Sequence, residues 1–562
     1  MEELSARTDE HEFYLSAPKG YRVGKTKYVV ITGSVISGVG KGTFSSCIGT
    51  ILSLFHGFRV SPIKFDGYLN CDAGTLNPFR HGEVFVLDDG TECDLDLGSY
   101  ERMLNKNLSK DNYLTSGKIF KMIIDKERAG GYLGRDVQFI PHVTGEIKGF
   151  LRNLASKTDA DIVLVEVGGT VGDLENSYFI EAMRELSYEE GRENVFFINV
   201  TYILEPRSLG EHKSKAAQLG VKSLMSLGVQ PNMIICRSEN PVNEKVREKI
   251  SIFSNVPLSR VVNCYDVGNM YSIPLFLMES GVDKEIINSL NLKKWEKIDE
   301  INLGKWKQLA KKTENPVNEV TVGITGKYTN VHDSYISIIK ALEHSGSYSG
   351  TKVNIRWIET TEIENGENDI NEVMKGLDGI IIPGGFGKRG IEGKIMCAKY
   401  ARENNIPYLG LCLGFQIALM EFARNVCGIK DADSTEMNPD TKSPVVDILP
   451  EQKKIEGLGG NMRLGGKDVE VKKGTLAHKL YGKDMVRKRF RHRFECNPEY
   501  IQTLERNGLV FSGKHPKYPI MQILEIPKHP FFLATQYHAE FTSKTLHPEP
   551  LFSGFLKACM KK

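Results

Sequence analysis

The chain alternates short apolar segments with helical segments in two separate series, and this pattern restricts the fold more than any other feature. In the first series, five apolar runs have the length and composition of buried strands: KYVVITGS (27–34), RVSPIKFD (59–66), ADIVLVEVGG (160–169), NVFFINVTYIL (194–204) and PNMIICRS (231–238). Helical patterns fill the intervals between them. Strands that alternate with helices predict a mostly parallel sheet.

A second series of the same kind begins at Glu319. It contains a helical pattern at 333–346 and the strand patterns EVTVGITGKY (319–328), KVNIRWIE (352–359), LDGIIIPGGFG (377–387) and IPYLGLCLG (406–414). Between the two series, the chain is charged and lacks a buried strand, so we expect a linker with some helix there. We therefore predict an α/β protein of two domains, each a mostly parallel sheet flanked by helices. The predicted boundaries are a polar tail (1–22), a first domain (23–290), a linker (291–318) and a second domain (319–562).

Composition excludes several classes of protein. A chain of 562 residues is too long for one ordinary domain, and 40% hydrophobic with 26% charged residues is typical of a globular protein. The net charge of +2 argues against a general nucleic-acid binder. The ten cysteines form no Cys-x-x-Cys pair, and no apolar run reaches the roughly 18 residues that a membrane span needs. We expect a cytoplasmic protein with neither nucleic acid nor membrane as a partner.

A glycine-rich turn, SGVGKG (37–42), lies between the first strand pattern and an apolar helix. Its backbone N–H groups and the helix N-terminus could hold phosphate oxygens while Lys41 neutralises their charge. The spacing departs from the usual Walker pattern, because Gly42 follows the lysine where Ser or Thr is expected. The motif favours a nucleotide site, and the alternative is a structural glycine turn.

Acidic residues near this turn suggest a metal. Glu92, Asp94 and Asp96 are spaced two apart, so an extended strand would place their carboxylates on one face. Glu166 ends an apolar strand, at the sheet edge where α/β proteins bind ligands. Such carboxylates suit Mg²⁺ on nucleotide phosphates, and we favour Asp96 and Glu166 as ligands. For Glu92 and Asp94 a solvated strand face is an equal alternative.

Lys64 and Asp66 follow another predicted strand and could point into the same cleft. A lysine there could stabilise a phosphoryl group during transfer, which depends on positioning and charge neutralisation. The alternative is an ion pair at a strand end.

A cysteine lies on a tight corner in the second series. Strand, Gly410-x-Cys412-x-Gly414 and helix form the pattern of a nucleophile elbow, and the helix N-terminus favours a thiolate there. The glycine turn PGGFG (383–387) could complete an oxyanion hole. Near the C-terminus, His538 and Glu540 supply a candidate base and the group that orients it. A lone His-x-Glu is usually surface decoration, but together with the corner and the turn it indicates catalysis.

The second half resembles the class I glutamine amidotransferase domain, whose pattern is Pro-Gly-Gly, Gly-x-Cys-x-Gly-x-Gln and a late His-Pro-Glu. Here these are PGGFG, GLCLGFQ and YHAEF. Five further segments are similar to CTP synthases: SGVGKG, KFDGYLNCDAGTLNPFRHGEVFVLDDGTECDLDLGSYER, GGYLGRDVQFIPHVTGEI, VEVGGTVGDLE and RHRFECN. This resemblance implies a P-loop-like synthetase (amidoligase) domain and a class I glutaminase domain. It also implies a carbon-nitrogen ligase of pyrimidine biosynthesis, which phosphorylates the 4-oxygen of UTP with MgATP and displaces the phosphate with ammonia. The ammonia comes from glutamine through a thioester and travels through an internal tunnel.

The resemblance assigns roles residue by residue. For ATP it implies Ser37, Gly38, Val39, Gly40, Lys41, Gly42, Asp96, Arg237 and Asp266. For Mg²⁺ it implies Asp96 and Glu166, for the phosphoryl step Lys64 with Asp66, and for the tunnel exit His81. For UTP, and for CTP as a feedback inhibitor, it implies Asp173, Leu174, Glu175, Lys213, Lys215, Gln218 and Lys249. For glutamine it implies Gly385, Leu413, Gln416, Glu436 and Arg493.

The resemblance also implies regulation and assembly. The segment GLGGNMRLGG (457–466), which includes Arg463, resembles a mobile lid where GTP acts as an allosteric activator, and the alternative is an ordinary surface loop. A UTP site shared between subunits implies a homotetramer, and filaments are possible in this family. The functional alternatives are a ligase that amidates a carboxylate on a cofactor precursor, and a scaffold that has lost its chemistry.

The chain departs from the family pattern at several positions. Ala539 replaces the usual proline between His538 and Glu540, so we expect looser placement of His538. The other departures are Ser34 for a frequent glycine, Gly67 for a frequent proline, and Ala216 and Ala217 for Pro and Thr.

Overall fold

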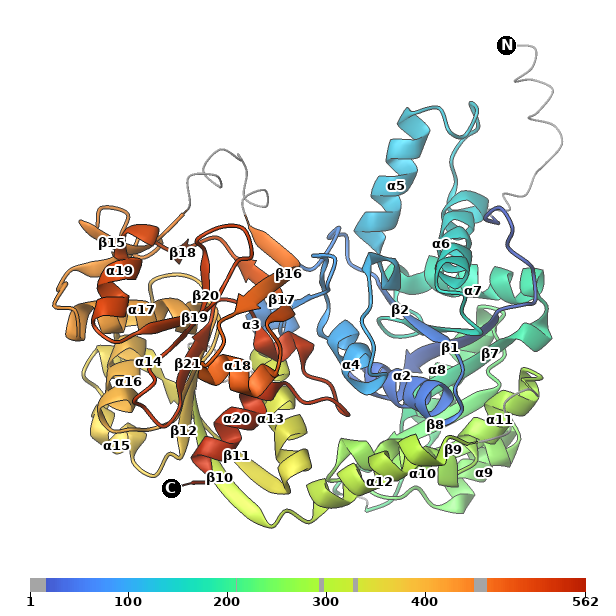
Figure 1. Cartoon of the computed structure of the whole chain (residues 1–562). Coiled ribbons are helices and arrows are strands. Elements are labelled where there is room, and N and C mark those ends of the chain that lie inside the picture. The colour runs from blue at the N-terminus through green and yellow to red at the C-terminus, as the bar shows by residue number, and fades with distance from the viewer. Residues whose placement is uncertain (1–16, 209, 293–297, 327–331, 449–461, 562) are drawn as a thin grey trace. The chain divides into compact units, whose positions relative to one another are not determined.

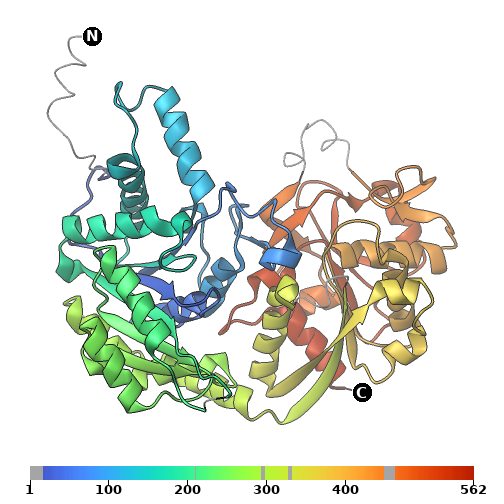
Figure 2. The same cartoon turned by 180° about the vertical axis from the view of Figure 1, so that it is seen from behind.

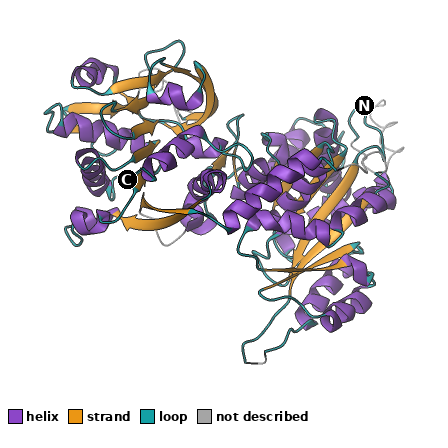
Figure 3. Ribbon diagram, turned by 60° about the horizontal axis from the view of Figure 1, so that its bottom comes forward, coloured by secondary structure: helices purple, strands orange, loops and turns teal. Residues whose placement is uncertain are grey.

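The computed structural model describes residues 17–208, 210–292, 298–326, 332–448 and 462–561. The chain divides by contacts into two compact units, with Met1–Thr75 and Ser99–Ala310 in unit 1 and Leu76–Gly98 and Lys311–Lys562 in unit 2. The segment 76–98, which our boundaries place in the first domain, thus groups with the second. Each unit contains one large sheet with helices around it (Figures 1 and 3).

The large sheet of unit 1 has seven strands among the described residues, in the order β5-β2-β6-β1-β7-β8-β9. They are β1 (Lys27–Ser34), β2 (Val60–Asp66), β5 (Tyr113–Thr115), β6 (Ile162–Val167), β7 (Val195–Tyr202), β8 (Met233–Ser238) and β9 (Val261–Tyr265). All of the pairs are parallel. The five strands predicted from the first series are therefore confirmed, and the short strands β5 and β9 were missed.

Helices cover both faces of this sheet, and Figure 2 shows them from behind. They are α2 (Lys41–Thr50), α4 (Leu95–Met103, which crosses the division between the units), α5 (Ser116–Arg128), α6 (Thr144–Lys157), α7 (Ser177–Glu190), α8 (Lys215–Ser226), α9 (Glu244–Ser254), α10 (Ile273–Glu279), α11 (Val282–Ser289) and α12 (Glu300–Glu314). Tyr28 and Val30 pack into the core under α6 and α7, whereas Val29 and Ile31 point to the opposite face and are also fully buried. Burial on both faces explains why the strands are continuous apolar runs.

The large sheet of unit 2 has nine strands among the described residues, in the order β11-β10-β12-β13-β21-β20-β19-β16-β17. They are β10 (Asn318–Gly326), β11 (Thr351–Glu359), β12 (Gly379–Ile382), β13 (Tyr408–Leu411), β16 (Arg463–Val471), β17 (Met485–His492), β19 (Val510–Lys514), β20 (Met521–Glu525) and β21 (Phe532–Thr535). The first five in this order pair in parallel, and the remaining pairs are antiparallel. The parallel part matches the strand patterns predicted for the second series.

Smaller elements complete unit 2. A three-stranded sheet contains β14 (Ala432–Ser434), β15 (Ser443–Asp447) and β18 (Glu495–Cys496), and a hairpin contains β3 (Phe85–Val86) and β4 (Glu92–Cys93). The helices are α3 (Pro78–His81), α13 (Ile336–Ser349), α14 (Thr360–Glu364), α15 (Ile370–Met374), α16 (Ile391–Glu403), α17 (Leu413–Asn425), α18 (Leu476–Tyr481), α19 (Pro498–Arg506) and α20 (Pro550–Cys559). One core cluster lies between the parallel strands and α16 and α17, and another lies on the opposite face under α13 and α20.

The expectation that Glu92, Asp94 and Asp96 share one face of a strand is wrong. The strand ends at Cys93, and α4 begins at Leu95, so Asp96 lies in the first turn of a helix. The physical reason is local: the side chain of Asp94 accepts a hydrogen bond from the N–H of Asp96 at 3.0 Å, which satisfies a backbone donor at the helix start.

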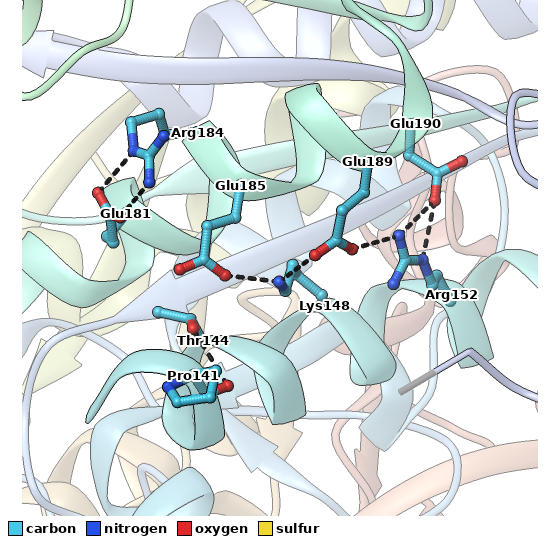
Figure 4. Close-up of polar contacts among 9 residues, drawn as sticks. All are labelled: Pro141, Thr144, Lys148, Arg152, Glu181, Arg184, Glu185, Glu189 and Glu190. Carbon is cyan, nitrogen blue, oxygen red and sulfur yellow. Dashed lines mark hydrogen bonds and ion pairs between the residues drawn. The ribbon is translucent and has the colours of Figure 1, made fainter. Parts of the chain in front are cut away.

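Buried ion pairs join α6 to α7 in unit 1 (Figure 4). The Nζ atom of Lys148 lies 2.5 Å from carboxylate oxygens of both Glu185 and Glu189. Arg152 binds Glu189 at 2.8 Å and Glu190 at 2.7 Å, and Glu190 also accepts the N–H of Gly24 at 2.9 Å. The two helices and the segment that precedes β1 are therefore held together by charge as well as by apolar packing.

Two further expectations can be compared with the structure. The ten cysteines all lie in the described residues, and they form no disulfide with one another. Among the helices of the described residues, none combines the length and the apolar character needed to cross a bilayer. Part of the predicted linker, 293–297, and most of the predicted tail, 1–16, lie outside the described residues.

Candidate functional site

Cys412 sits at the sharp corner between β13 and α17 in unit 2. Its backbone has φ 52° and ψ −97°, a conformation that non-glycine residues rarely adopt. The N–H of Cys412 donates to the carbonyl of Thr535 at 2.7 Å. A Cβ atom on Gly414 would lie 2.1 Å from the carbonyl oxygen of Ile382, so only glycine fits there. The strained corner places the thiol at the N-terminus of a helix, as in a nucleophile elbow.

His538 and Glu540 follow β21, the strand that pairs with β13. The Nδ1 atom of His538 lies 2.7 Å from Oε1 of Glu540, and both side chains are buried. The imidazole stacks on Phe541 with 4.7 Å between ring centroids. Its backbone N–H donates to the carbonyl of Arg489 at 2.9 Å. These three contacts hold the ring where Ala539 replaces the usual proline, and the looser placement of His538 stays a prediction.

The charges around His538 favour its protonated form. Burial lowers the pKa of His538, but the negative charges of Glu540 and Cys412 outweigh it and raise the pKa to about 10. The Nε2 atom has no hydrogen-bond partner among the described residues. A buried imidazolium in this position can pass its proton to a leaving group.

The glycine turn after β12 faces the cysteine corner. A Cβ atom on Gly384 would lie 2.7 Å from Cε1 of His538 and 3.5 Å from Cβ of Cys412. A Cβ atom on Gly385 would lie 3.4 Å from Cδ2 of Leu413. Leu413 begins α17, so its N–H has no acceptor within the helix. The glycine turn and the cysteine corner therefore approach each other closely, and added side chains at Gly384 would clash with His538.

Three further residues expected at the glutamine site lie around this corner. Gln416 is buried on the first turns of α17, donates from Nε2 to the carbonyl of Phe494 at 3.1 Å, and has no described partner for Oε1. Arg493 precedes Phe494 in the chain. Glu436 accepts the N–H of Gly387, in the glycine turn, at 3.0 Å. The structure thus brings the predicted glutamine residues together in unit 2.

In unit 1, the glycine-rich turn leads from β1 directly into α2. Gly40 caps the helix with φ 94°, and Lys41 is the first helical residue. The Nζ atom of Lys41 donates to the carbonyl of Gly169 at 2.6 Å, which places it beside the end of β6. Arg237 pairs with Asp266 at 2.5 Å, and its guanidinium would lie 3.8 Å from a Cβ on Gly40. The two residues expected at the ATP base and ribose therefore lie next to the phosphate loop.

Lys64 and Glu166 form a buried pair at the ends of the neighbouring strands β2 and β6. The Nζ atom of Lys64 lies 3.2 Å from Oε1 of Glu166 and 4.0 Å from Oδ1 of Asp66. The other oxygen of Glu166 accepts the hydroxyl of Tyr100, and Asp66 accepts the hydroxyl of Tyr68 at 3.1 Å. The sequence did not indicate either tyrosine. Tyr100 is distant in the chain from its partner Glu166, and Tyr68, two residues after Asp66, belongs to no recognisable motif.

The carboxylates at this edge fit a magnesium ion. Carboxylate oxygens are the donors that Mg²⁺ prefers, and the carboxylate of Glu166 is almost fully buried, where a negative charge requires a cation. Lys64 supplies one such charge. In the described part of the chain, no group of three or more His, Cys, Asp or Glu side chains is arranged to hold a metal by itself. Any ion would therefore need further oxygen ligands, which nucleotide phosphates supply.

The residues expected at the UTP site fall into two groups in unit 1. In the loop after β6, Asp173 accepts the N–H of Thr170 at 2.7 Å, and Leu174 is exposed. The second group is on or before α8 and on α9. Lys213 forms an ion pair with Glu211, and the Nζ atom of Lys215 lies 5.6 Å from the ring centroid of Phe253. Gln218 donates from Nε2 to the hydroxyl of Ser214 at 3.1 Å. Lys249 lies on α9.

Comparison with known proteins identifies the family. Residues 27–292 match the family described as CTP synthase N-terminus, and residues 330–558 match class I glutamine amidotransferases. A CTP synthase of Thermococcus gammatolerans is 50% identical over 538 residues, which cover 96% of this chain and 99% of that protein. The chain belongs to the CTP synthase family. A CTP synthase of Methanocaldococcus jannaschii is 48% identical over 541 residues, covering 95% of this chain and 98% of that protein.

Among solved structures, one similar protein is the glutaminase domain of the Trypanosoma brucei CTP synthase with bound acivicin. It is 36% identical to this chain, covers 43% of this chain and 94% of its own, and has a TM-score of 0.40.

Two departures from the CTP synthase pattern have a local explanation. Ser34 donates to Asn199 at 3.0 Å, and Gly220 lies opposite it, where an added Cβ would approach Ser34 to 2.6 Å. A Cβ on Gly67 would lie 2.9 Å from Cβ of Glu175, so the small residue lets the loop after β6 approach the end of β2. Nothing in the structure explains Ala216. The neighbouring Ala217 is a buried residue of α8 and belongs to a hydrophobic core cluster.

Of the expected lid, residues 457–461 lie outside the described residues. Arg463, which begins β16, pairs with the buried Glu495 at 2.7 Å. His81 ends the short helix α3 in unit 2.

Proposed function

We propose that this chain is a glutamine-hydrolysing CTP synthase, which uses ATP to aminate UTP. The observation that carries the proposal is the presence of two complete constellations in one chain. Unit 2 holds Cys412 beside the imidazolium of His538 and a turn of backbone donors. Unit 1 holds the phosphate loop of Lys41 beside the buried pair of Lys64 and Glu166.

We infer a glutaminase reaction in unit 2 that uses the residues around Cys412. The thiolate of Cys412 attacks the amide carbon of glutamine, and the N–H groups of Leu413 and Gly385 bind the resulting oxyanion. His538 gives its proton to the leaving nitrogen, so that ammonia departs and a thioester remains. His538 then takes a proton from water, which attacks the thioester and releases glutamate. Glu540 holds the imidazole in the required orientation.

The synthetase reaction belongs to unit 1. The terminal phosphoryl group of ATP moves to the 4-oxygen of UTP, and ammonia then displaces phosphate to give CTP. Lys41 holds ATP phosphates, and Lys64 neutralises the charge of the phosphoryl group in transfer. Mg²⁺ bound at Glu166 would neutralise phosphate charge. Asp66 keeps Lys64 aligned.

The remaining assignments belong to the same proposal. Arg237 and Asp266 contact the base and ribose of ATP, and Asp173, Glu175, Lys213, Lys215, Gln218 and Lys249 contact UTP or the inhibitor CTP. His81 lines the exit of the ammonia tunnel. GTP acts as an activator beside the glutaminase site, and the working form is a cytoplasmic homotetramer.

An ultraviolet assay of UTP conversion, with ATP and Mg²⁺, tests the proposal with glutamine and with ammonium salts as nitrogen sources. Both should yield CTP. A panel of other nucleotides and of carboxylate acceptors should give no product. Failure to form CTP from either nitrogen source would contradict the proposal.

The variant Cys412→Ala separates the two half-reactions. It should abolish glutamine-dependent synthesis, because no thioester can form, while ammonia-dependent synthesis continues. Equal loss with both nitrogen sources would argue against this division of labour.

A further inference from the structure

A short hairpin from the N-terminal family region packs against the glutaminase machinery. Strands β3 and β4 pair antiparallel, with Phe85 opposite Cys93 and Val86 opposite Glu92. The hairpin lies within the region 27–292 that matches the CTP synthase N-terminus, yet it groups with unit 2. It is therefore part of the environment of Cys412, although it is far from Cys412 in sequence.

Three alternate arginines of β17 reach toward the hairpin, because alternate side chains of a strand point to the same side. The Nε atom of Arg491 donates to Oε1 of Glu92 at 2.7 Å, and Nη1 of Arg489 donates to the carbonyl of Val86 at 3.1 Å. Arg487 donates to both carboxylate oxygens of Asp88, from Nη2 to Oδ2 at 2.9 Å and from Nε to Oδ1 at 3.0 Å.

Strand β16, which neighbours β17, also packs closely against the hairpin. The N–H of Gly466 on β16 donates to the carbonyl of Asp88 at 2.7 Å. A Cβ on Gly466 would lie 2.1 Å from Oδ1 of Asp88, and one on Gly465 would lie 2.5 Å from the backbone nitrogen of Gly90. The hairpin is thus closely fitted to β16 and β17.

The backbone of β17 holds the catalytic pair. Strand β17 is the last in the order of its sheet, so its outer edge can accept other hydrogen bonds. The carbonyl of Arg489 accepts the N–H of His538 at 2.9 Å, and the carbonyl of Arg491 accepts the thiol of Cys412 at 3.7 Å. Two of the three arginines that bind the hairpin, Arg489 and Arg491, therefore contact His538 and Cys412 through their backbone carbonyls.

Aromatic rings form a second connection. Phe85 of the hairpin packs edge-on against Phe541 with 5.1 Å between centroids, and Phe541 stacks on the imidazole of His538. The guanidinium of Arg491 also lies 5.3 Å from the ring of Phe386 in the glycine turn.

Burial distinguishes the two carboxylates of the hairpin. The side chains of Glu92 and Arg491 are only 12% and 15% exposed, whereas Asp88 and Arg487 are 32% and 52% exposed. A partly buried pair loses more when one partner is removed than an exposed pair does. Of these two carboxylates, we therefore expect Glu92 to contribute more to the attachment of the hairpin to β17.

We propose that the β3–β4 hairpin positions the glutaminase centre, and that Glu92 acts through Arg491 as a positioning residue for Cys412 and His538. The inference rests on the glutaminase half of the proposed function and adds a residue to it. Glu92 touches no substrate. Its removal releases the side of β17 on which Cys412 and His538 rest, and small displacements of reacting groups are costly in rate.

The test measures glutamate release from glutamine, with ATP, UTP, GTP and Mg²⁺ present, for wild type, Glu92→Ala, Glu92→Gln, Arg491→Ala and the double variant. We expect Glu92→Ala to lower kcat about tenfold with KM for glutamine changed less than about twofold. Glu92→Gln should lose less, because its amide oxygen can still accept from Arg491. The double variant should lose no more than Arg491→Ala alone, because Glu92 acts only through that arginine.

The matched control is Glu470→Ala on β16, which breaks the exposed pair with Lys514 in the same sheet. Its kcat should stay within about twofold of wild type. Equal rates for Glu92→Ala and Glu470→Ala would overturn the inference, as would additive losses in the double variant or a change confined to KM. If Glu92→Ala fails to fold, Glu92→Gln is compared with Glu470→Gln by the same criteria.

Failure of the inference and failure of the proposed function give different results. Glutamate release does not require that UTP be the acceptor, so the variants can be compared whatever the nucleotide. A wild-type protein that releases no glutamate contradicts the proposed function, whereas release that does not depend on Glu92 contradicts the inference alone.

Discussion

At the scale of single residues, the candidate centres depend on buried charged side chains, each of which has a polar or oppositely charged partner. Glu166 is held by Lys64 and Tyr100, and His538 is held by Glu540 and Phe541. A buried charge without a partner is costly, so these pairs are stable only as units. Sequence reasoning identified the charged members because they follow strand patterns, but the contact of Tyr100 with Glu166 became visible only when distant segments were brought together.

Glu540→Gln should lower the kcat of glutamine hydrolysis by about 10² to 10⁴-fold, because the neutral amide no longer raises the pKa of His538 or fixes its orientation. Initial rates of glutamate release measure this effect. Ammonia-dependent CTP synthesis in the same preparation serves as the reference, and a glutaminase rate close to wild type would show that the carboxylate is dispensable.

The raised pKa of His538 also predicts how stability depends on pH. A histidine whose pKa is raised from 6.5 to about 10 on folding contributes stability that is fully present below pH 6.5 and lost as the pH rises through 10. Urea unfolding between pH 6 and about 10.5 should therefore show a decline that is smaller in Glu540→Gln. Identical profiles for the two proteins would contradict the assigned charge state.

Lys64→Ala should suppress CTP synthesis from glutamine and from ammonia alike by at least about 10²-fold, because phosphoryl transfer precedes the use of either nitrogen source. Steady-state rates with each source measure the loss. Glutamate release should persist in this variant and shows that unit 2 is folded. Substantial CTP synthesis would remove Lys64 from the phosphoryl step.

At the scale of elements, the parallel strands were the easiest part of the fold to predict. Both faces of β1, β6 and β13 are buried, so each is a continuous apolar run. Strand β17, with the sequence MVRKRFRH, was missed because its charged side chains suggest a surface segment, whereas they bind the hairpin of β3 and β4. The start of α4 was also missed, because Asp94 caps a helix in a stretch whose alternation suggests a strand.

Helices α6 and α7 offer a matched comparison of a buried and an exposed ion pair (Figure 4). Arg152→Met leaves the fully buried Glu190 without its cation and should lower the free energy of unfolding by about 3 to 5 kcal/mol. Arg184→Met breaks a pair whose arginine and glutamate side chains are 41% and 24% exposed, and this change should cost less than about 1 kcal/mol. Urea denaturation of both variants gives the two values, and similar losses would contradict the structural role of the buried cluster.

At the scale of the whole molecule, the chain combines two α/β units with different chemistry. The phosphate loop, with its buried lysine and carboxylate, lies in unit 1, and the cysteine corner lies in unit 2. The two family matches, 27–292 and 330–558, follow the same order along the chain, except that 76–98 lies within the first match. The division itself was predictable from the two series of strands. The assignment of 76–98 to unit 2 was not, because it depends on packing between segments about 400 residues apart in the chain, such as Arg487 and Asp88.

The central claim is that nitrogen released at Cys412 in unit 2 is incorporated into a nucleotide bound by unit 1. Glutamine labelled with ¹⁵N in its side-chain amide, supplied with UTP, ATP and Mg²⁺, tests this claim most directly when the product is analysed by mass spectrometry. The account predicts CTP that carries the label in its exocyclic amine. CTP without label, or glutamate release without any CTP, would contradict it.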